Sequence, residues 1–70
     1  MDDFFTARFN EVLKEYNVNQ TLLAKAINVS KQCITDYKKG LSYPSIKTLQ
    51  LLCKELNVPS DYLLGLSDTY

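Results

Sequence analysis

The sequence predicts an all-α, compact five-helix domain. Apolar residues recur at intervals of three and four along five stretches, which is the spacing that lines one face of a helix. Most of these stretches follow a residue that caps helices well and precede asparagine or glycine, as is typical of helix ends. No stretch alternates apolar and polar residues with a period of two, so we expect no sheet. A chain of 70 residues is long enough for one domain, covering 1–70.

The first two predicted helices end at asparagines. Asp2 or Asp3 can cap the first helix, whose apolar stripe consists of Phe5, Phe9, Val12, Leu13 and Tyr16. Asn17 breaks this pattern, and Asn19 is a suitable cap for a short second helix that bears Leu23, Ala24 and Ile27. Asn28 follows, and asparagine tolerates the left-handed backbone conformation in which many helices end.

Three further helices complete the predicted domain. Ser30 is a good N-cap for the third, in which Ile34 and Tyr37 are three residues apart and which Gly40 ends. Pro44 and Ser45 start the fourth, whose apolar face consists of Leu49, Leu52, Cys53 and Leu56. Ser60, after Pro59, is expected to cap a last short turn that Gly65 ends and that contains Tyr62, Leu63 and Leu64. We expect the apolar stripes to form the core, with Cys53 as a small buried hydrophobic residue.

The charge is zero overall but unevenly distributed. Eight basic residues balance eight acidic ones, which at first argues against a nucleic-acid partner. Residues 19–47, however, hold five lysines and a single acidic residue, Asp36, so the centre carries a net charge of +4. The segments 1–18 and 48–70 each carry −2. The sequence thus places a basic centre between acidic ends.

Composition argues against an enzyme, a metalloprotein and a membrane protein. The chain has no histidine, no glycine-rich phosphate loop and no serine with a plausible base, so acid–base and nucleophilic chemistry lack their usual groups. Cys33 and Cys53 are too few to make a zinc site within one chain, and we expect both to be reduced thiols. No apolar run approaches the ~18 residues that cross a bilayer. We therefore expect a cytoplasmic protein without cofactor or metal.

The segment from Gln20 to Lys39 has the spacing of two helices that cross at a tight turn. The small Ala24 allows a close approach, Asn28 makes the turn, and Ile34 with Tyr37 anchors the following helix from beneath. One face of that helix is left free. Its outward residues are all polar: Lys31, Gln32, Thr35 and Asp36.

From about Phe9 to Leu64 the sequence resembles the repressor and Cro-type helix-turn-helix proteins, also called the Xre family. The matching pieces, in order, are Asn19-Gln20, Leu23-Ala24, Asn28-Val29-Ser30, Ile34, Gly40, Pro44-Ser45, Asn57-Val58-Pro59-Ser60 and Tyr62-Leu63-Leu64-Gly65. The resemblance implies a single helix-turn-helix domain with the motif at about 20–39. It also implies a transcriptional regulator, a repressor of a short palindromic operator in double-stranded DNA, with the third helix in the major groove.

The outward residues suit base edges. The Gln32 amide matches adenine N6 and N7, Lys31 can donate to guanine or to a phosphate, and the Thr35 methyl can contact a thymine methyl. Asp36 could accept from a cytosine amino group and would repel phosphates. The residues expected at the DNA backbone lie at the starts of the two helices and after the second of them: Asn19, Gln20, Ser30, Lys38, Lys39, Ser42 and Tyr43.

Two alternatives stay open at this point. The outward residues could be a solvated helix face, with Asp36 merely paired to Lys39 three residues on. The chain could also be a protein-interaction module on a repressor-like scaffold that binds another regulator, with an apolar contact surface made of Leu22, Leu51, Tyr62 and Leu66. Cys33, within the third helix, could be a redox switch or a neutral filler.

A homodimer is the expected assembly. Two copies related by a two-fold axis would span half-sites ~34 Å apart and double a small basic footprint. The residues expected at this dimer interface are Val58, Pro59, Tyr62 and Leu66.

Overall fold

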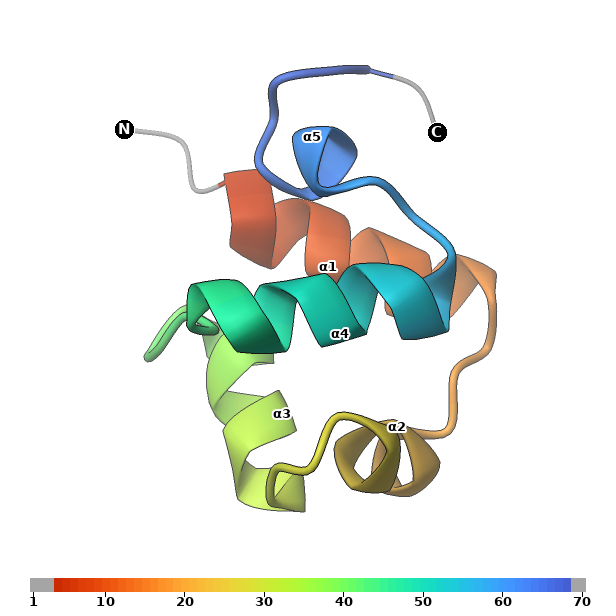
Figure 1. Ribbon diagram of the computed structural model, residues 1–70, viewed down its shortest axis with the longest axis vertical. Coiled ribbons are helices and arrows are strands. Elements are labelled where there is room, and N and C mark those ends of the chain that lie inside the picture. The colour runs from red at the N-terminus through yellow and green to blue at the C-terminus, as the bar shows by residue number, and fades with distance from the viewer. Residues whose placement is uncertain (1–3, 69–70) are drawn as a thin grey trace.

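The computed structural model describes residues 4–68, and within them it has five helices and no strand (Figure 1). The helices are α1 (Phe4–Glu15), α2 (Gln20–Ala26), α3 (Lys31–Lys39), α4 (Ile46–Leu56) and α5 (Ser60–Leu63). Helix α1 packs against α3 and α5, α2 packs against α3 and α4, and α4 also contacts α5. The all-α, five-helix prediction is confirmed.

Side-chain caps fix where three of the helices begin. The side chains of Asn19, Ser30 and Ser45 each accept a hydrogen bond from the backbone N–H three residues on, at 3.0, 3.1 and 3.2 Å. Each of these bonds satisfies a donor that the first helical turn leaves without a partner. The predicted cap at Ser60 is wrong, because Pro59 occupies the N-cap position of α5 without a side-chain bond and Ser60 is already helical. The proposed cap at Asp2 or Asp3 lies outside the described residues.

Left-handed residues fix where the helices end. Asn17, Asn28 and Asn57 have φ of 51°, 60° and 55°, and Gly40 has φ of 74°. Apart from glycine, asparagine is the residue that adopts this backbone conformation most readily. The three asparagines can therefore turn the chain without a glycine. The predicted ends at Asn17, Asn28 and Gly40 are confirmed.

The core lies between the five helices and is apolar throughout. Its fully buried members come from every part of the chain: Phe9, Val12, Ile27, Ile34, Leu52, Val58 and Leu63. Phe5 stacks on Phe9 with ring centroids 5.4 Å apart, and the Tyr37 ring packs edge-to-face with both. Tyr16 was expected in the stripe of α1 but is 46% exposed, because α1 ends at Glu15. Cys53, expected to be buried, is half-buried against the core, and Leu64 is exposed.

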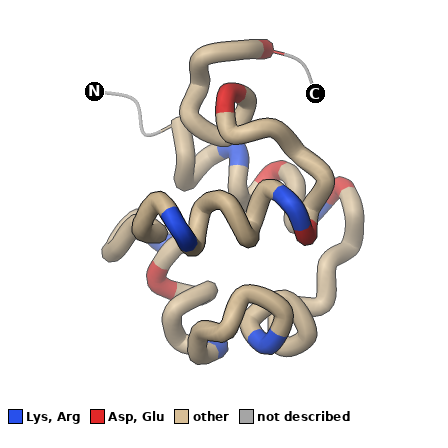
Figure 2. The backbone as a smooth tube through the Cα atoms, in the orientation of Figure 1, with Lys and Arg blue, Asp and Glu red and all other residues tan. Residues whose placement is uncertain are grey.

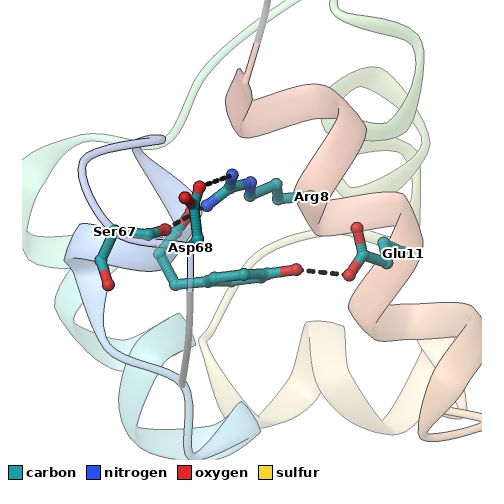
Figure 3. Close-up of polar contacts among 5 residues, drawn as sticks. Arg8, Glu11, Ser67 and Asp68 are labelled. Carbon is teal, nitrogen blue, oxygen red and sulfur yellow. Dashed lines mark hydrogen bonds and ion pairs between the residues drawn. The ribbon is translucent and has the colours of Figure 1, made fainter.

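Arg8 fastens the C-terminal segment to α1 (Figure 3). Its guanidinium donates to the carbonyls of Tyr62, at 2.9 Å, and of Ser67, and it pairs with the Asp68 carboxylate at 3.3 Å. The same group lies over the Tyr62 ring, 4.3 Å from its centroid, in a cation–π arrangement. The Tyr62 hydroxyl in turn donates to the Glu11 carboxylate. That hydrogen bond, followed by burial, raises the pKa of the Tyr62 phenol.

Gly65 allows the same segment to pass close to α1. Its φ is +80°, and a Cβ placed there would collide with the side chain of Phe4. A side chain at this position would therefore force the C-terminal segment away from α1.

Candidate nucleic-acid interface

Helices α2 and α3 form a rigid unit joined by a four-residue turn. Asn28 supplies the left-handed step, and the backbone N–H of Val29 donates to the Ala24 carbonyl at 2.9 Å. Ala24 is buried where the two helices approach each other, and its small size permits that approach. Ile34 and Tyr37 attach the inner side of α3 to the core, where they are 0% and 4% exposed. The orientation of α3 is thus set by packing on one side only.

The opposite side of α3 presents the polar residues that the sequence singled out. Lys31 and Gln32 are exposed, while Thr35 and Asp36 are half-buried one turn further along. The Thr35 hydroxyl donates back to the Lys31 carbonyl at 3.3 Å. All four predicted base-reading residues therefore lie on α3 with solvent access, although Thr35 and Asp36 have less than Lys31 and Gln32.

Asp36 holds the amide of Gln32. The Gln32 Nε2 donates to Asp36 Oδ1 at 2.9 Å, an i to i+4 contact along the helix. An amide nitrogen carries two hydrogens, so one N–H and the carbonyl oxygen of Gln32 stay free for another partner. Within residues 4–68 Asp36 makes no ion pair with Lys39, so the alternative pairing considered from the sequence is wrong.

Charge is separated along the molecule (Figure 2). Acidic positions gather around α1 and α5, together with Glu55 at the end of α4. The opposite end, formed by α2 and the first turn of α3, carries Lys25 and Lys31 and no acidic residue. Two of the five lysines of the basic centre thus lie at this end of the folded domain, whereas Lys38 and Lys39 lie in the last turn of α3 and Lys47 lies on α4.

The residues predicted to contact a DNA backbone lie at both ends of α3. At its beginning, a shallow hollow beside the start of α2 is lined by Val18, Asn19, Gln20, Thr21 and Lys31. The side chains of Asn19 and Ser30 use an oxygen for capping, which leaves their N–H and O–H donors directed elsewhere. The prediction that Lys38 and Lys39 follow this helix is wrong, because α3 extends to Lys39; in its last turn Lys39 is exposed and Lys38 is half-buried. Beyond the end of α3, Tyr43 is exposed and Ser42 is half-buried. The Tyr43 ring also forms a T-shaped pair with the Phe5 ring, with centroids 6.1 Å apart.

The two cysteines are free thiols, as predicted, and neither is fully exposed. Cys33 lies half-buried on α3 next to Tyr37. Burial, followed by the neighbouring Cys33 side chain, raises the pKa of Tyr37 to about 12, so this phenol stays neutral. Burial also raises the pKa of the Cys53 thiol. No group of three or more residues among His, Cys, Asp and Glu in 4–68 could hold a metal ion.

Sequence reasoning missed a second hollow, between α1, α2 and α3. It brings Lys14, in the last turn of α1, and Asn17, just after that helix, next to Gln20 and Lys38. Lys14 belongs to a segment of negative net charge, so the charge pattern gave no reason to select it. Only the packing of α1 against α3 reveals the juxtaposition.

The structure corrects half of the predicted dimer interface. Val58 and Tyr62 are 2% and 5% exposed within a single chain, so their side chains pack in the core and have little surface to offer a second copy. Pro59 and Leu66 are exposed. Of the residues considered for an apolar contact surface, Leu22 is exposed and Leu51 is partly buried against the core.

Comparison with known proteins agrees with this architecture. The model of the helix-turn-helix family matches residues 10–63, which is most of the chain and includes α2, the turn and α3. The chain belongs to the helix-turn-helix family. The resemblance to this family seen in the sequence therefore rests on an independent match.

Two relatives extend this assignment. The helix-turn-helix chain is 31% identical over 65 residues to the cryptic phage CTXphi transcriptional repressor RstR of Vibrio cholerae. That match covers 93% of the chain and 59% of the repressor, so the chain spans about three fifths of this relative's length. The fold matches the DNA-binding domain of the P22 C2 repressor with a TM-score of 0.83 and 29% identity, covering 100% of this chain and 96% of that one. In residues 4–68 no helix has the length and apolar character needed to cross a membrane.

Proposed function

We propose that this chain is a sequence-specific DNA-binding transcriptional regulator that represses by occupying its site, with α3 in the major groove. The observation that carries the proposal is the pair of faces of α3, one locked into the core and the other polar, solvent-accessible and flanked by lysines. A helix attached in this way can enter a major groove without disturbing the core. The repressor relative and the DNA-binding domain of similar fold support the same function.

Gln32 is the proposed principal base reader. Its contact with Asp36 orders the amide before binding, while the remaining N–H and the carbonyl oxygen form the donor and acceptor pair that adenine N7 and N6 require. Asp36 then acts chiefly by orienting Gln32 and by repelling phosphates, with cytosine recognition secondary. Thr35 lies close enough to the outer face to offer its methyl to a thymine.

Lysines at both ends of α3 are proposed to contact the DNA backbone. Lys31 shares the hollow beside α2 with Asn19 and Gln20, which favours a phosphate over a guanine as its partner. Ser30 lies at the start of α3, and the flanking backbone would be met by residues in its last turn and just after it: Lys38, Lys39, Ser42 and Tyr43. Such contacts fix the register of the protein while Gln32 reads the sequence.

The regulator is proposed to act as a homodimer on a short palindrome. One copy offers few lysines and no net charge, and a two-fold pair doubles the contacts at half-sites ~34 Å apart. Pro59 and Leu66 are the predicted interface residues that a second copy can reach, and Ile46 is an additional exposed apolar residue at 88% exposure. Sedimentation equilibrium with and without the selected duplex would test this assembly.

Selection of duplexes from a random pool tests the proposed function directly. We expect enrichment of a short palindrome, and log K for that duplex should fall linearly with log salt concentration, at a slope of about −0.9 per phosphate neutralised. Failure to retain any duplex at low salt would exclude the DNA-binding function. Salt-insensitive binding to another regulator, with no binding to DNA, would instead support the protein-interaction module.

A further inference from the structure

We propose that the hollow between α1, α2 and α3 is a second binding site for a DNA backbone phosphate, with Lys14 and Lys38 as its cationic groups. The proposal rests on the DNA-binding function above. It adds a contribution from α1, which is not part of the recognition unit formed by α2 and α3. Asn10, Asn17 and Gln20 complete the polar lining. The ligand class is a phosphodiester oxygen of double-stranded DNA.

The charge of this hollow is entirely positive. Two lysines and three amide side chains line it together with two apolar residues, and no carboxylate is among them. Within residues 4–68 the side chains of Lys14, Asn17, Gln20 and Lys38 make no hydrogen bond or ion pair with the protein. Elsewhere on α1, by contrast, Arg8 and Glu11 are both bound to partners. Donors left open around one hollow are suited to an anion.

The fifth polar residue of the hollow, Asn10, holds its wall in place. Its Nδ2 donates to the carbonyl of Thr6 at 2.8 Å and to that of Lys38 at 2.9 Å. The second of these bonds ties the last turn of α3 directly to α1. This bond therefore helps to hold the last turn of α3, which carries Lys38, against α1, which carries Lys14, so both lysines line one hollow before any ligand is bound.

The position of the hollow fits the path of a DNA strand. Gln20 and Val18 line this hollow and also the one that contains Lys31, so the two hollows adjoin at the start of α2. Lys31 and Lys38 are seven residues apart on α3, a rise of roughly 10 Å at 1.5 Å per residue. That equals about three base-pair steps of 3.4 Å measured along the duplex axis. One strand crossing the start of α2 could thus place phosphates at both hollows.

The test uses the full chain, a fluorescent 24-base-pair duplex of random sequence, and anisotropy over a range of salt concentrations. Lys14→Gln should weaken binding about three- to tenfold at low salt and reduce the magnitude of the salt slope by about 0.9, because one phosphate contact is lost. Lys14→Arg should restore both values. Lys54→Gln, an equal loss of charge at an exposed position of α4, is the matched control and should leave the slope unchanged.

The outcomes separate this site from the function on which it rests. A wild-type chain that binds no duplex overturns the proposed function itself. A wild-type chain that binds with a steep salt slope, while Lys14→Gln behaves as Lys54→Gln does, overturns only the second phosphate site. A neutral methylphosphonate scanned along the selected duplex adds a positional readout. One position should weaken the wild-type chain but not Lys14→Gln, and the absence of any such position counts against the site.

Discussion

At the end of the domain formed by α1 and α5, polar side chains bind one another, whereas at the end formed by α2 and α3 they are held in place with donors left open. Arg8 donates hydrogen bonds to two backbone carbonyls and pairs with a carboxylate, and the Tyr62 hydroxyl donates to Glu11. Gln32, by contrast, has one N–H and its oxygen free. The first arrangement stabilises the fold, and the second leaves hydrogen-bonding capacity for a ligand. Substitutions at the two ends should therefore affect different measurements.

A substitution on the inner side of α3 should affect both stability and DNA binding, and it gives the largest expected effect. Ile34→Ala removes a side chain with no exposure and should lower the free energy of unfolding by ~2–5 kcal/mol. A domain of this size has ~5–15 kcal/mol in total, so DNA binding should be lost together with the fold. Urea unfolding followed by circular dichroism measures the change. A loss under ~1 kcal/mol would mean that α3 is not anchored by this residue.

Arg8→Ala tests the comparison between the two ends of the domain at the α1–α5 end. Two backbone carbonyls lose a charged donor and Tyr62 loses its cation–π partner, which should lower the free energy of unfolding by ~1–3 kcal/mol. DNA affinity of the folded protein should be unchanged. Asp68→Asn removes only the exposed member of the cluster, so it is a suitable control and should cost no more than ~0.5 kcal/mol. Equal effects of the two variants would contradict the role given to the buried carbonyl contacts.

Gln32→Ala tests the comparison between the two ends of the domain at the α2–α3 end. On the selected site the variant should lose ~1–3 kcal/mol of binding free energy and tolerate more bases at one position, while urea unfolding stays nearly unchanged. Competition with single-base variants of the duplex measures both effects. Asp36→Asn should produce a weaker form of the same phenotype, because it retains an acceptor for the Gln32 amide. A loss spread evenly over all sequences would rule out base reading by Gln32.

Lys39→Ala should have the smallest effect and a different signature. Lys39 is exposed at the end of α3, where a phosphate contact carries no sequence information. We expect equal weakening on selected and unselected duplexes and a salt slope smaller in magnitude by ~1. Titrations of both duplexes at several salt concentrations provide the comparison. A change in base preference would show that Lys39 reaches a base edge instead.

Local signals predicted most of the fold. Asn19 and Ser30 were predicted as caps because their side chains act within three residues, and Asn28 was predicted as the turn because of its tolerance for positive φ. Tyr16 follows the apolar spacing yet lies beyond the last helical residue, so periodicity alone placed it wrongly in the core. The residue type of Ser60 predicts a cap, but Pro59 occupies that position.

The candidate site likewise has features that the sequence could predict and features that it could not. The polar face of α3 could be predicted because its four residues lie on a single helix whose inner face is marked by Ile34 and Tyr37. The contact between Gln32 and Asp36 has ordinary helical spacing, but Lys39 offered Asp36 a competing partner and the sequence could not rank the two. Lys14 and Lys38 meet only through the packing of α1 on α3, which no local pattern encodes.

The Arg8 contacts also bear on the order in which the chain assembles. They join residues 54 to 60 positions apart, and bringing such distant segments together costs more loop entropy than pairing α2 with α3, which are close in sequence. Contacts between near neighbours in sequence form faster. We therefore expect the recognition unit to form early in folding and the Arg8 contacts to form late, so that native-state amide exchange should show α5 opening before α3.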